Sequence, residues 1–281
     1  MNYALPVLVV NERTVPEAWE KSIKKLWENG IEIKTEYDKA EDPPSKDCTM
    51  VMAVREPMAE PRIHLFSMGI DLKGLAEYRE EILSGSLDHW VEEGKLSYTY
   101  HERLFDYTFE PKTSKRSRGI DQINRMIKKL SEVPYSRRAQ AITWNPSLDT
   151  ETDSPPCLQR LWGRCFRAED GRLYFNMNTH WRSRDAYKAA FANMFGITEL
   201  QKMIADGIAE TRGEEVLVGQ YTDISDSYHI YGRDREDVEN RFLKNLSRRS
   251  YYDDSIVKSR TLRSDSKIFQ NIVEEIKKRN I

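Results

Sequence analysis

The chain has 281 residues and a mass of 33.0 kDa, and its 44 Lys and Arg residues against 46 Asp and Glu residues give a formal net charge of -2. This balance gives no reason to expect a nucleic-acid partner. With 39% hydrophobic and 10% aromatic residues, the chain can bury a substantial core, which excludes global disorder.

No stretch approaches the run of about eighteen apolar residues that a membrane span needs, and residues 1–10 lack the layout of a signal peptide. We therefore expect a cytoplasmic protein with no membrane partner. The three cysteines, Cys48, Cys157 and Cys165, are an odd number without a CxxC pair. This pattern indicates neither a disulfide framework nor a metal site.

Local signals in the first half of the chain predict alternating strands and helices. Residues 3–10 are an apolar run typical of a strand. Thr14, Pro16 and Glu17 resemble a capping box, which predicts a helix that ends near Gly30. Further predicted elements are a strand over residues 49–54 and helices over residues 72–85 and 120–130.

The second half of the chain is richer in strand signals. Glu169, Asp170 and Gly171 form a hairpin signal between two strand-like runs. Periodicity predicts strands over residues 139–144, 158–166, 172–180 and 216–231, and helices over residues 185–207, 237–246 and 268–276. Together these elements predict an α+β fold, with a mixed β-sheet core and flanking helices.

Cys157 is the strongest candidate for a nucleophile. Pro155 and Pro156 restrict the backbone just before it, at the entrance to a predicted strand. A thiolate also needs nearby cations, for which the chain offers Arg137, Arg138, Arg182 and Arg184. The alternative is a buried, inert thiol, and we keep that interpretation for Cys48 and Cys165.

Two further motifs have polar side chains that suit a nucleotide. Arg182 and Ser183 are expected where a strand ends and a helix begins, which is a natural phosphate site. Alternatively, they are a helix cap with solvated arginines. His229 and Tyr231 alternate onto one face of a strand, where two hydrogen-bonding rings can hold a sugar, although half-buried strands also use tyrosine freely.

Taken in order, these motifs resemble the thymidylate synthase family. The resemblance covers residues 137–231, and it runs through Arg137-Arg138, Trp144-Asn145-Pro146, Pro155-Pro156-Cys157, Arg182-Ser183 with Asp185 and Asn193, and His229-x-Tyr231. Residues 98–103 (YTYHER) and residues 181–185 (WRSRD) resemble the divergent archaeal-type members. Residues 1–60 and the last thirty residues of the chain show no match to the family pattern. We expect residues 1–60 to be a divergent segment packed on a catalytic domain of residues 61–281.

The resemblance implies a methyltransferase of dTMP biosynthesis, with a thymidylate synthase-like fold and a homodimer formed through the sheet face. The substrates would be dUMP and a methylene-carrying reduced pterin, of tetrahydrofolate or tetrahydromethanopterin type, without a metal. Uracil C5 is a poor nucleophile, so a thiolate must first add at C6. Cys157 would supply that thiolate.

The resemblance also implies roles for residues that contact the nucleotide. Arg182 and Ser183 would bind its phosphate, and Arg137 and Arg138 would reach the same phosphate from the other subunit. Asn193 would read the pyrimidine edge.

The remaining implied roles concern the sugar, the pterin and proton transfer. His229 and Tyr231 would bind the ribose 3′-hydroxyl, and Asp185 would contact the pterin ring. Tyr100 and Glu77 would serve proton transfer. The alternatives to Glu77 are Glu80 and Glu81.

The sequence departs from the family pattern at three places. Leu158 follows the candidate nucleophile where histidine is usual, and Asp226 stands one position early, with Ser227 in the place of the usual aspartate. Residues 277–281 are not the small apolar tail that closes over folate in most members. These departures concern the pterin more than the pyrimidine chemistry.

Two other functions compete with methylation. A pyrimidine nucleotide hydroxymethylase acting on dCMP, CMP or dUMP would use the same nucleophile, but Asn193 favours uracil over cytosine. A catalytically silent nucleotide- or RNA-binding regulator would need neither Cys157 nor a reduced pterin, and the near-neutral charge argues against it.

Overall fold

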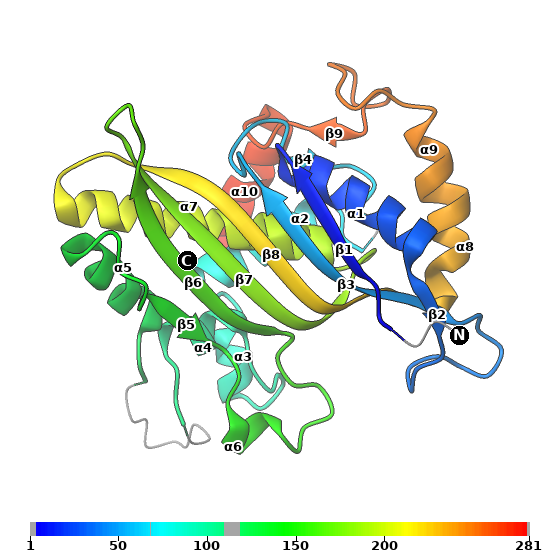
Figure 1. The fold of residues 1–281 in the computed structure, drawn as a ribbon, viewed down its shortest axis with the longest axis horizontal. Helices are drawn as coiled ribbons and strands as arrows, with labels where there is room; N and C mark the ends of the chain where they lie inside the picture. Colours follow the sequence, from blue (N-terminus) through cyan, green and yellow to red (C-terminus); the bar gives the residue numbers. More distant parts are fainter. Residues whose placement is uncertain (1–3, 68, 110–118, 280–281) are drawn as a thin grey trace.

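A seven-stranded mixed sheet forms the centre of the computed structural model, which describes residues 4–67, 69–109 and 119–279. The strand order is β1-β3-β8-β7-β6-β5, with β2 paired to β3 outside this path (Figure 1). The strands are β1 (Val7–Glu12), β2 (Ile31–Ile33), β3 (Ser45–Val54), β5 (Gln140–Ile142), β6 (Leu158–Arg167), β7 (Leu173–Asp185) and β8 (Val216–Ile230). A separate small sheet pairs β4 (Ile63–His64) with β9 (Thr261–Leu262).

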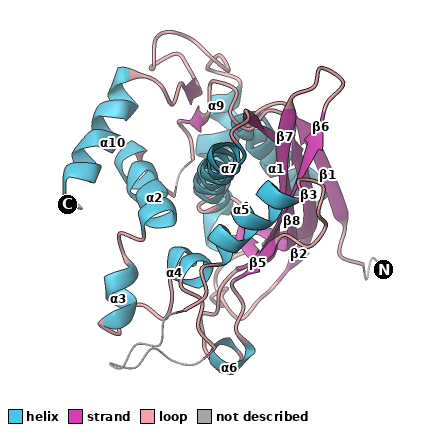
Figure 2. Cartoon of the chain, turned by 90° about the vertical axis from the view of Figure 1, so that its left-hand side faces the viewer, coloured by secondary structure: helices cyan, strands magenta, loops and turns pink. Residues whose placement is uncertain are grey.

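Helices cover one face of the sheet in two layers. Figure 2 shows α1, α5 and α7 against the sheet, with α2 and α10 outside α7. The helices are α1 (Val15–Asn29), α2 (Leu72–Ser84), α3 (Asp88–Glu92), α4 (Tyr100–Phe105), α5 (Gln122–Glu132), α6 (Pro146–Asp149), α7 (Ala190–Arg212), α8 (Arg235–Asp237), α9 (Lys244–Leu246) and α10 (Lys267–Arg279). A short 3-10 turn (Gly232–Asp234) and a π-helical turn (Val238–Leu243) flank α8. The α+β class with a mixed sheet is therefore confirmed, and none of the described helices is long and apolar enough to cross a membrane.

The strongest local signals in the sequence mark the observed boundaries well. Thr14 caps α1, because its hydroxyl accepts from the Glu17 amide while the Glu17 carboxylate accepts from the Thr14 amide, and Gly30 ends the helix. The predicted hairpin also forms, with Gly171 at a φ of 83° in its turn. The first strand begins only at Val7, and the predicted start at Tyr3 lies outside the described residues.

The predicted start of the long helix is wrong, and this changes the candidate phosphate site. The long helix begins at Ala190 rather than at residue 185, because β7 continues to Asp185. Residues 181–185 form a parallel ladder with β8, from Trp181 opposite Ser225 to Asp185 opposite His229. Arg182 and Ser183 therefore lie in a strand and not at a helix N-terminus.

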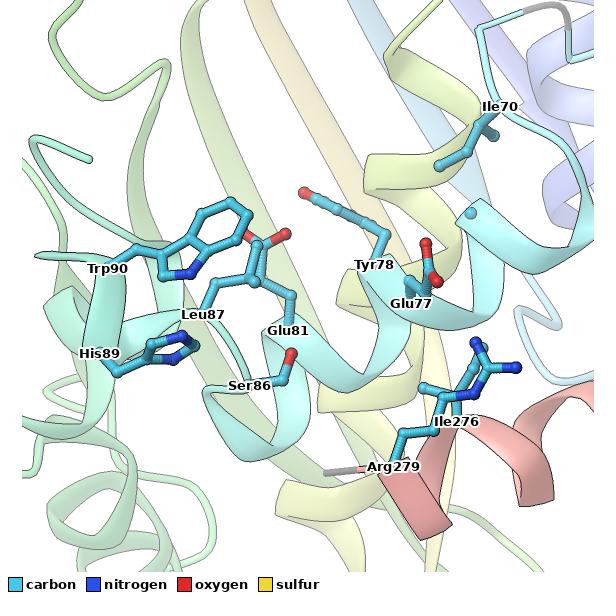
Figure 3. A pocket seen from close by; sticks show the side chains of 11 residues that line it. Ile70, Glu77, Tyr78, Glu81, Ser86, Leu87, His89, Trp90, Ile276 and Arg279 are labelled. Atoms are coloured by element: carbon cyan, nitrogen blue, oxygen red, sulfur yellow. The ribbon is translucent and has the colours of Figure 1, made fainter. Parts of the chain in front are cut away.

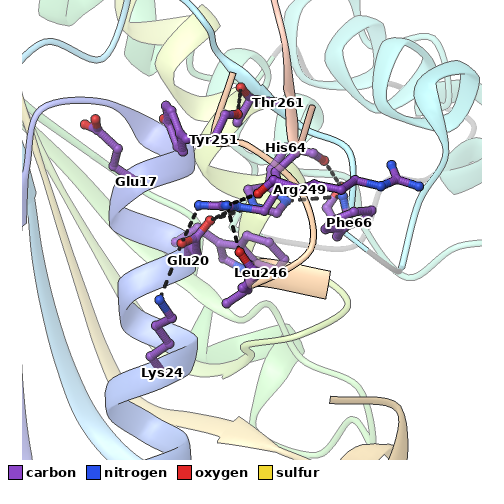
Figure 4. A network of polar contacts seen from close by, with 12 residues as sticks. Glu17, Glu20, Lys24, His64, Phe66, Leu246, Arg249, Tyr251 and Thr261 are labelled. Carbon is purple, nitrogen blue, oxygen red and sulfur yellow. Dashed lines mark hydrogen bonds and ion pairs between the residues drawn. The ribbon is translucent and has the colours of Figure 1, made fainter. Parts of the chain in front are cut away.

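The C-terminal part of the chain is tied to α1 through Glu20. The Glu20 carboxylate lies 3.3 Å from His64 Nε2 and accepts from Arg260 Nε at 3.0 Å, as Figure 4 shows for the labelled Glu20 and His64. Arg260 also donates to the Leu246 carbonyl, and the His64 ring packs edge-on against Trp19 at 4.8 Å. This buried network joins α1, β4 and the segment that follows α9.

We expect acidification to destabilise this network through His64. Burial lowers the pKa of His64, and Arg260 already neutralises Glu20, so a proton on His64 would add a second cation beside one carboxylate. Because the unfolded chain binds that proton more readily, the free energy of unfolding should fall as the pH drops below about 6.5, the ordinary pKa of histidine.

The variant His64→Gln separates this effect from other titrations. It should lose about 1–3 kcal/mol at neutral pH, where the buried hydrogen bond to Glu20 is disturbed, but its stability should decline less steeply on acidification. Denaturant unfolding of both proteins at about pH 7.5 and about pH 5.5 measures the difference. Parallel pH dependences would show that His64 is not the titrating group.

Candidate active site

Cys157 immediately precedes β6, and Arg182 of β7 holds the segment around it. The Arg182 amide donates to the Cys157 carbonyl at 2.9 Å, while its guanidinium donates to the carbonyls of Pro156 at 3.0 Å and Pro155 at 2.6 Å. The two prolines also restrict the backbone just before the thiol. Arg182 therefore positions the loop of the candidate nucleophile.

The thiol of Cys157 is partly exposed, in contrast to the other two cysteines. Burial raises its pKa, while the charges of Arg182 and Arg184 oppose that rise. Cys48 and Cys165 are buried in the core, and burial raises the pKa of each to about 12. Cys157 is thus the accessible thiol in a cationic neighbourhood, and the prediction that the other two are buried is confirmed.

Two tyrosines lie near Cys157. The Leu158 amide donates to the Tyr100 hydroxyl at 3.4 Å, and the Tyr98 and Tyr100 rings lie 5.6 Å apart. Burial raises the pKa of Tyr98 to about 12 and that of Tyr100 well above its usual value, and a charge on Cys157 raises both. Both hydroxyls therefore stay protonated and can donate to a ligand at the thiol.

Asn193, in the first turn of α7, contacts a residue that the sequence did not single out as functional. Its Nδ2 donates to the Tyr78 hydroxyl of α2 at 2.7 Å. In the sequence, Tyr78 has helical spacing with Leu75 and Ile82, which is typical of a core position. Charges on Tyr78 and on Cys157 would both raise the pKa of Tyr100, so Asn193 and Tyr78 lie near Tyr100 and the thiol.

The three candidate glutamates of α2 differ in environment. The Glu77 side chain is 51% exposed and pairs with Lys73 at 3.4 Å. Glu80 is buried and pairs with Arg79. Burial and the nearby Asp88 charge raise the pKa of Glu81 to about 7. Glu81 is therefore the member of this set that can exchange a proton near neutral pH.

A cavity of about 560 Å³ lies between α2, α3 and α10. Figure 3 shows the Tyr78 hydroxyl and the Glu81 carboxylate on the side of the cavity near Trp90, while Ile276 and Arg279 enter from α10. An aromatic face, apolar walls and a few polar groups suit a flat heterocycle. The C-terminal helix, up to Arg279, supplies a wall here, while Asn280 and Ile281 lie outside the described residues.

His229 and Tyr231 come together at the end of β8. The centroids of their rings lie 4.6 Å apart, in an edge-to-face arrangement. Burial raises the pKa of Tyr231, and charges on Asp185 and Cys157 raise it further. Asp185 lies opposite His229 in the β7–β8 ladder, and its carboxylate accepts from the amides of Tyr187 and Lys188. Burial raises the pKa of Asp185. This end of the sheet thus brings His229, Tyr231 and Asp185 close to the thiol.

Ser183 is half-buried in β7, opposite Ser227 of β8 and next in sequence to Arg182. Arg137 and Arg138 are exposed and lie away from Cys157 of the same chain. Gly163 donates to the Ala139 carbonyl, which places the arginines beside the far half of β6. At 3.3 Å per residue, that is about 20 Å from Cys157.

Comparisons with known proteins agree with the motifs. A sequence model of the thymidylate synthase family matches residues 18–278, so the match begins inside α1 and includes much of the N-terminal segment. A protein of Methanocaldococcus jannaschii is 30% identical over 230 residues, which is 80% of this chain and 91% of that protein.

Two further archaeal relatives match over a similar length. The protein of Methanosarcina acetivorans is 29% identical over 232 residues (83% of this chain, 93% of that protein), and that of Methanothermobacter marburgensis is 30% identical over 230 residues (77% and 90%). All three carry the name "Putative thymidylate synthase". By its motifs, its fold and these matches, the chain belongs to the thymidylate synthase family.

Proposed function

We propose that the protein is a thymidylate synthase that converts dUMP to dTMP by covalent attack of Cys157 on C6 of the pyrimidine. The observation that carries this proposal is that three side chains from different elements lie around one accessible thiol. They are Arg182 of β7, Tyr100 of α4 and Tyr231 at the end of β8. Family membership and the names of the archaeal relatives support the reaction class.

The chemistry follows from the reactivity of uracil. The Cys157 sulfur forms a bond to C6 as a thiolate, and the C5–C6 π electrons shift toward C5 and O4. C5 then bonds to the transferred carbon and loses its proton, and the bond from that carbon to the carrier nitrogen breaks, which leaves an exocyclic methylene on C5 while Cys157 stays bonded to C6. Addition of a hydride to that methylene restores the C5–C6 double bond, and the sulfur leaves with its bonding electrons. A methylene-carrying reduced pterin supplies both the carbon and the hydride that completes the methyl group. The Tyr98 and Tyr100 hydroxyls, held protonated, donate hydrogen bonds where negative charge develops.

The cavity beside Trp90 fits the flat ring of such a pterin. Trp90 offers an aromatic face in this cavity. Asp185, which we also assign to polar contact with the ring, lies at the end of β7 and does not line the cavity. Arg279 at the cavity wall suits an anionic tail on the carrier. Since the archaeal relatives include several methanogens by name, we propose a tetrahydromethanopterin-type carrier, with tetrahydrofolate as the alternative.

We further propose a homodimer in which the second copy supplies Arg137 and Arg138 to the phosphate bound by Arg182 and Ser183. The two arginines are exposed and about 20 Å along β6 from the thiol of their own chain, at 3.3 Å per residue. The sheet face away from the helices carries exposed apolar side chains, including Val7 (66% exposed) and Val9 (55% exposed). A self-complementary pairing through this face would bury them.

Glu81→Gln should lower kcat by about 10²–10³-fold, because a group with a pKa near 7 is suited to proton transfer at neutral pH. The pH dependence of kcat in the wild type should show an ionisation near pH 7 that is absent from the variant. Initial rates across the pH range measure both effects.

Glu77→Gln is the matched control on the same helix. Its side chain is half exposed and paired with Lys73, so activity should stay within about threefold. A large loss in Glu77→Gln with full activity in Glu81→Gln would transfer the proton-transfer role to Glu77.

Release of tritium from dUMP labelled at C5 tests the reaction class. If the proposal is right, tritium is released to water only when both the protein and a methylene pterin are present. Binding of dUMP without release would instead support a nucleotide-binding regulator.

A further inference from the structure

A chain of hydrogen bonds joins the N-terminal strand β3 to His229. The Ser227 hydroxyl lies 2.8 Å from Asp47 Oδ2 and 3.2 Å from His229 Nδ1. Asp47 is directly opposite His229 in the antiparallel β3–β8 ladder, although the two residues are far apart in sequence. The family motif has a carboxylate at the position of Ser227, and here a neighbouring strand supplies one.

Asp226, the nearest carboxylate in the sequence, does not take part. Its side chain is 57% exposed and accepts from His180 Nε2 at 2.9 Å, away from His229. The serine therefore stands between His229 and a carboxylate that comes from residues 1–60.

The direction of each hydrogen bond follows from what each group can do. An ionised carboxylate only accepts, so the Ser227 hydroxyl uses its single proton on Asp47. The serine oxygen can then only accept from His229, which requires the proton of the imidazole to be on Nδ1. His229 Nε2 is left with a lone pair, and it is therefore an acceptor.

The atoms at both ends of this chain lack a partner. Neither His229 Nε2 nor Asp47 Oδ1 has a hydrogen-bond partner among the described residues, and His229 is only 8% exposed. A buried polar atom without a partner is costly, which points to a ligand hydroxyl as the missing donor. Burial also lowers the pKa of His229, which keeps the ring neutral as an acceptor must be.

The N-terminal segment holds the neighbouring backbone as well. Asp38 accepts from the Ser45 hydroxyl and from the Gly232 amide, just after β8. A Cβ on Gly232 would lie 1.8 Å from the Pro43 carbonyl oxygen, so this close approach requires glycine. The geometry of residues 229–232 therefore depends on residues 38–47.

We propose that Asp47 is a positioning residue that acts through Ser227 to keep His229 in the Nδ1–H tautomer, so that Nε2 accepts a hydrogen bond from the ribose 3′-hydroxyl of the nucleotide. The ribose part of this inference rests on the proposed function. The tautomer part concerns the free protein and can be tested without any substrate.

Nitrogen NMR of histidine-labelled protein at about pH 8 tests the tautomer directly, since the two ring nitrogens have distinct shifts in each form. The wild type should show His229 as the Nδ1–H form, with its signals assigned by their loss in His229→Asn. In Asp47→Asn the new amide can donate to Ser227, which then donates to Nδ1, so the ring proton should move to Nε2.

Two further variants serve as controls for this result. Asp226→Asn is the matched control, because it removes an exposed carboxylate from His180 and should leave the His229 signals unchanged. Ser227→Ala breaks the same chain without altering Asp47, and it should also end the preference for Nδ1–H. An Nε2–H form of His229 in the wild type would overturn the inference. Retention of the Nδ1–H form in Asp47→Asn or in Ser227→Ala would overturn it as well.

Kinetics with dUMP and its 3′-deoxy analogue test the ribose contact. The wild type should prefer dUMP, and Asp47→Asn should lower kcat/KM for dUMP by about 10–100-fold while changing the analogue little. If the tautomer changes but this preference does not, the ribose contact is wrong. If the wild type does not turn over dUMP at all, the proposed function fails, and the NMR result still decides the role of Asp47.

Discussion

Cys157→Ser is expected to lower turnover by about 10⁴-fold or more while dUMP binding stays within about tenfold, because a serine hydroxyl is a far weaker nucleophile than a thiolate. Binding should persist because Arg182 is held by the carbonyls of Pro155 and Pro156 and not by the sulfur. Turnover and the Kd for dUMP, measured on the same preparation, check both parts.

Cys48→Ser and Cys165→Ser are the matched controls. Both thiols are buried in the core, so these variants should lose about 1–3 kcal/mol of stability and keep their specific activity when folded. Near-normal turnover by Cys157→Ser would remove Cys157 from the mechanism. Inactivation of a folded control would count against the assignment of Cys157 as the nucleophile.

Asn193→Asp is expected to shift the preference from dUMP toward dCMP by up to about 10⁴-fold, because a carboxamide can match O4 and N3–H of uracil and a carboxylate can only accept. The carboxylate would face uracil O4, whereas the amino group of cytosine can donate to it. The Tyr78 hydroxyl, which now accepts from Asn193 Nδ2, can rotate to donate to the new carboxylate, so the side chain should stay in place.

The ratio of kcat/KM for the two nucleotides, with one carbon donor, measures this shift. An equal fall for both nucleotides would indicate general damage. An unchanged ratio in an active variant would show that Asn193 does not read the base, and the assignment of uracil would lose its main support.

The sequence predicts best those features that depend on neighbouring residues. The capping box of Thr14 and Glu17 and the turn at Gly171 are local, so their energies are encoded within a few residues. The resemblance to the family likewise depends on short motifs, and a family model matches residues 18–278. In the structure a charge on Cys157 acts on both Tyr100 and Tyr231, while their roles stay a prediction.

Features set by distant contacts could not be predicted in the same way. β7 extends to Asp185 because β8 offers a ladder partner there, which overrides the local helix signal. The raised pKa of Glu81 depends on burial and on Asp88 in the next helix. The Asp47 contact with Ser227 spans strands separated by most of the chain, and no spacing in the sequence indicates it.

The most direct test of the account is product analysis by mass after incubation of the protein with dUMP and the methylene form of either tetrahydromethanopterin or tetrahydrofolate. The account predicts dTMP, formed in the wild type with at least one of the two carriers and absent with Cys157→Ser. A hydroxymethylated nucleotide, or a methylated product that Cys157→Ser makes equally well, would contradict it.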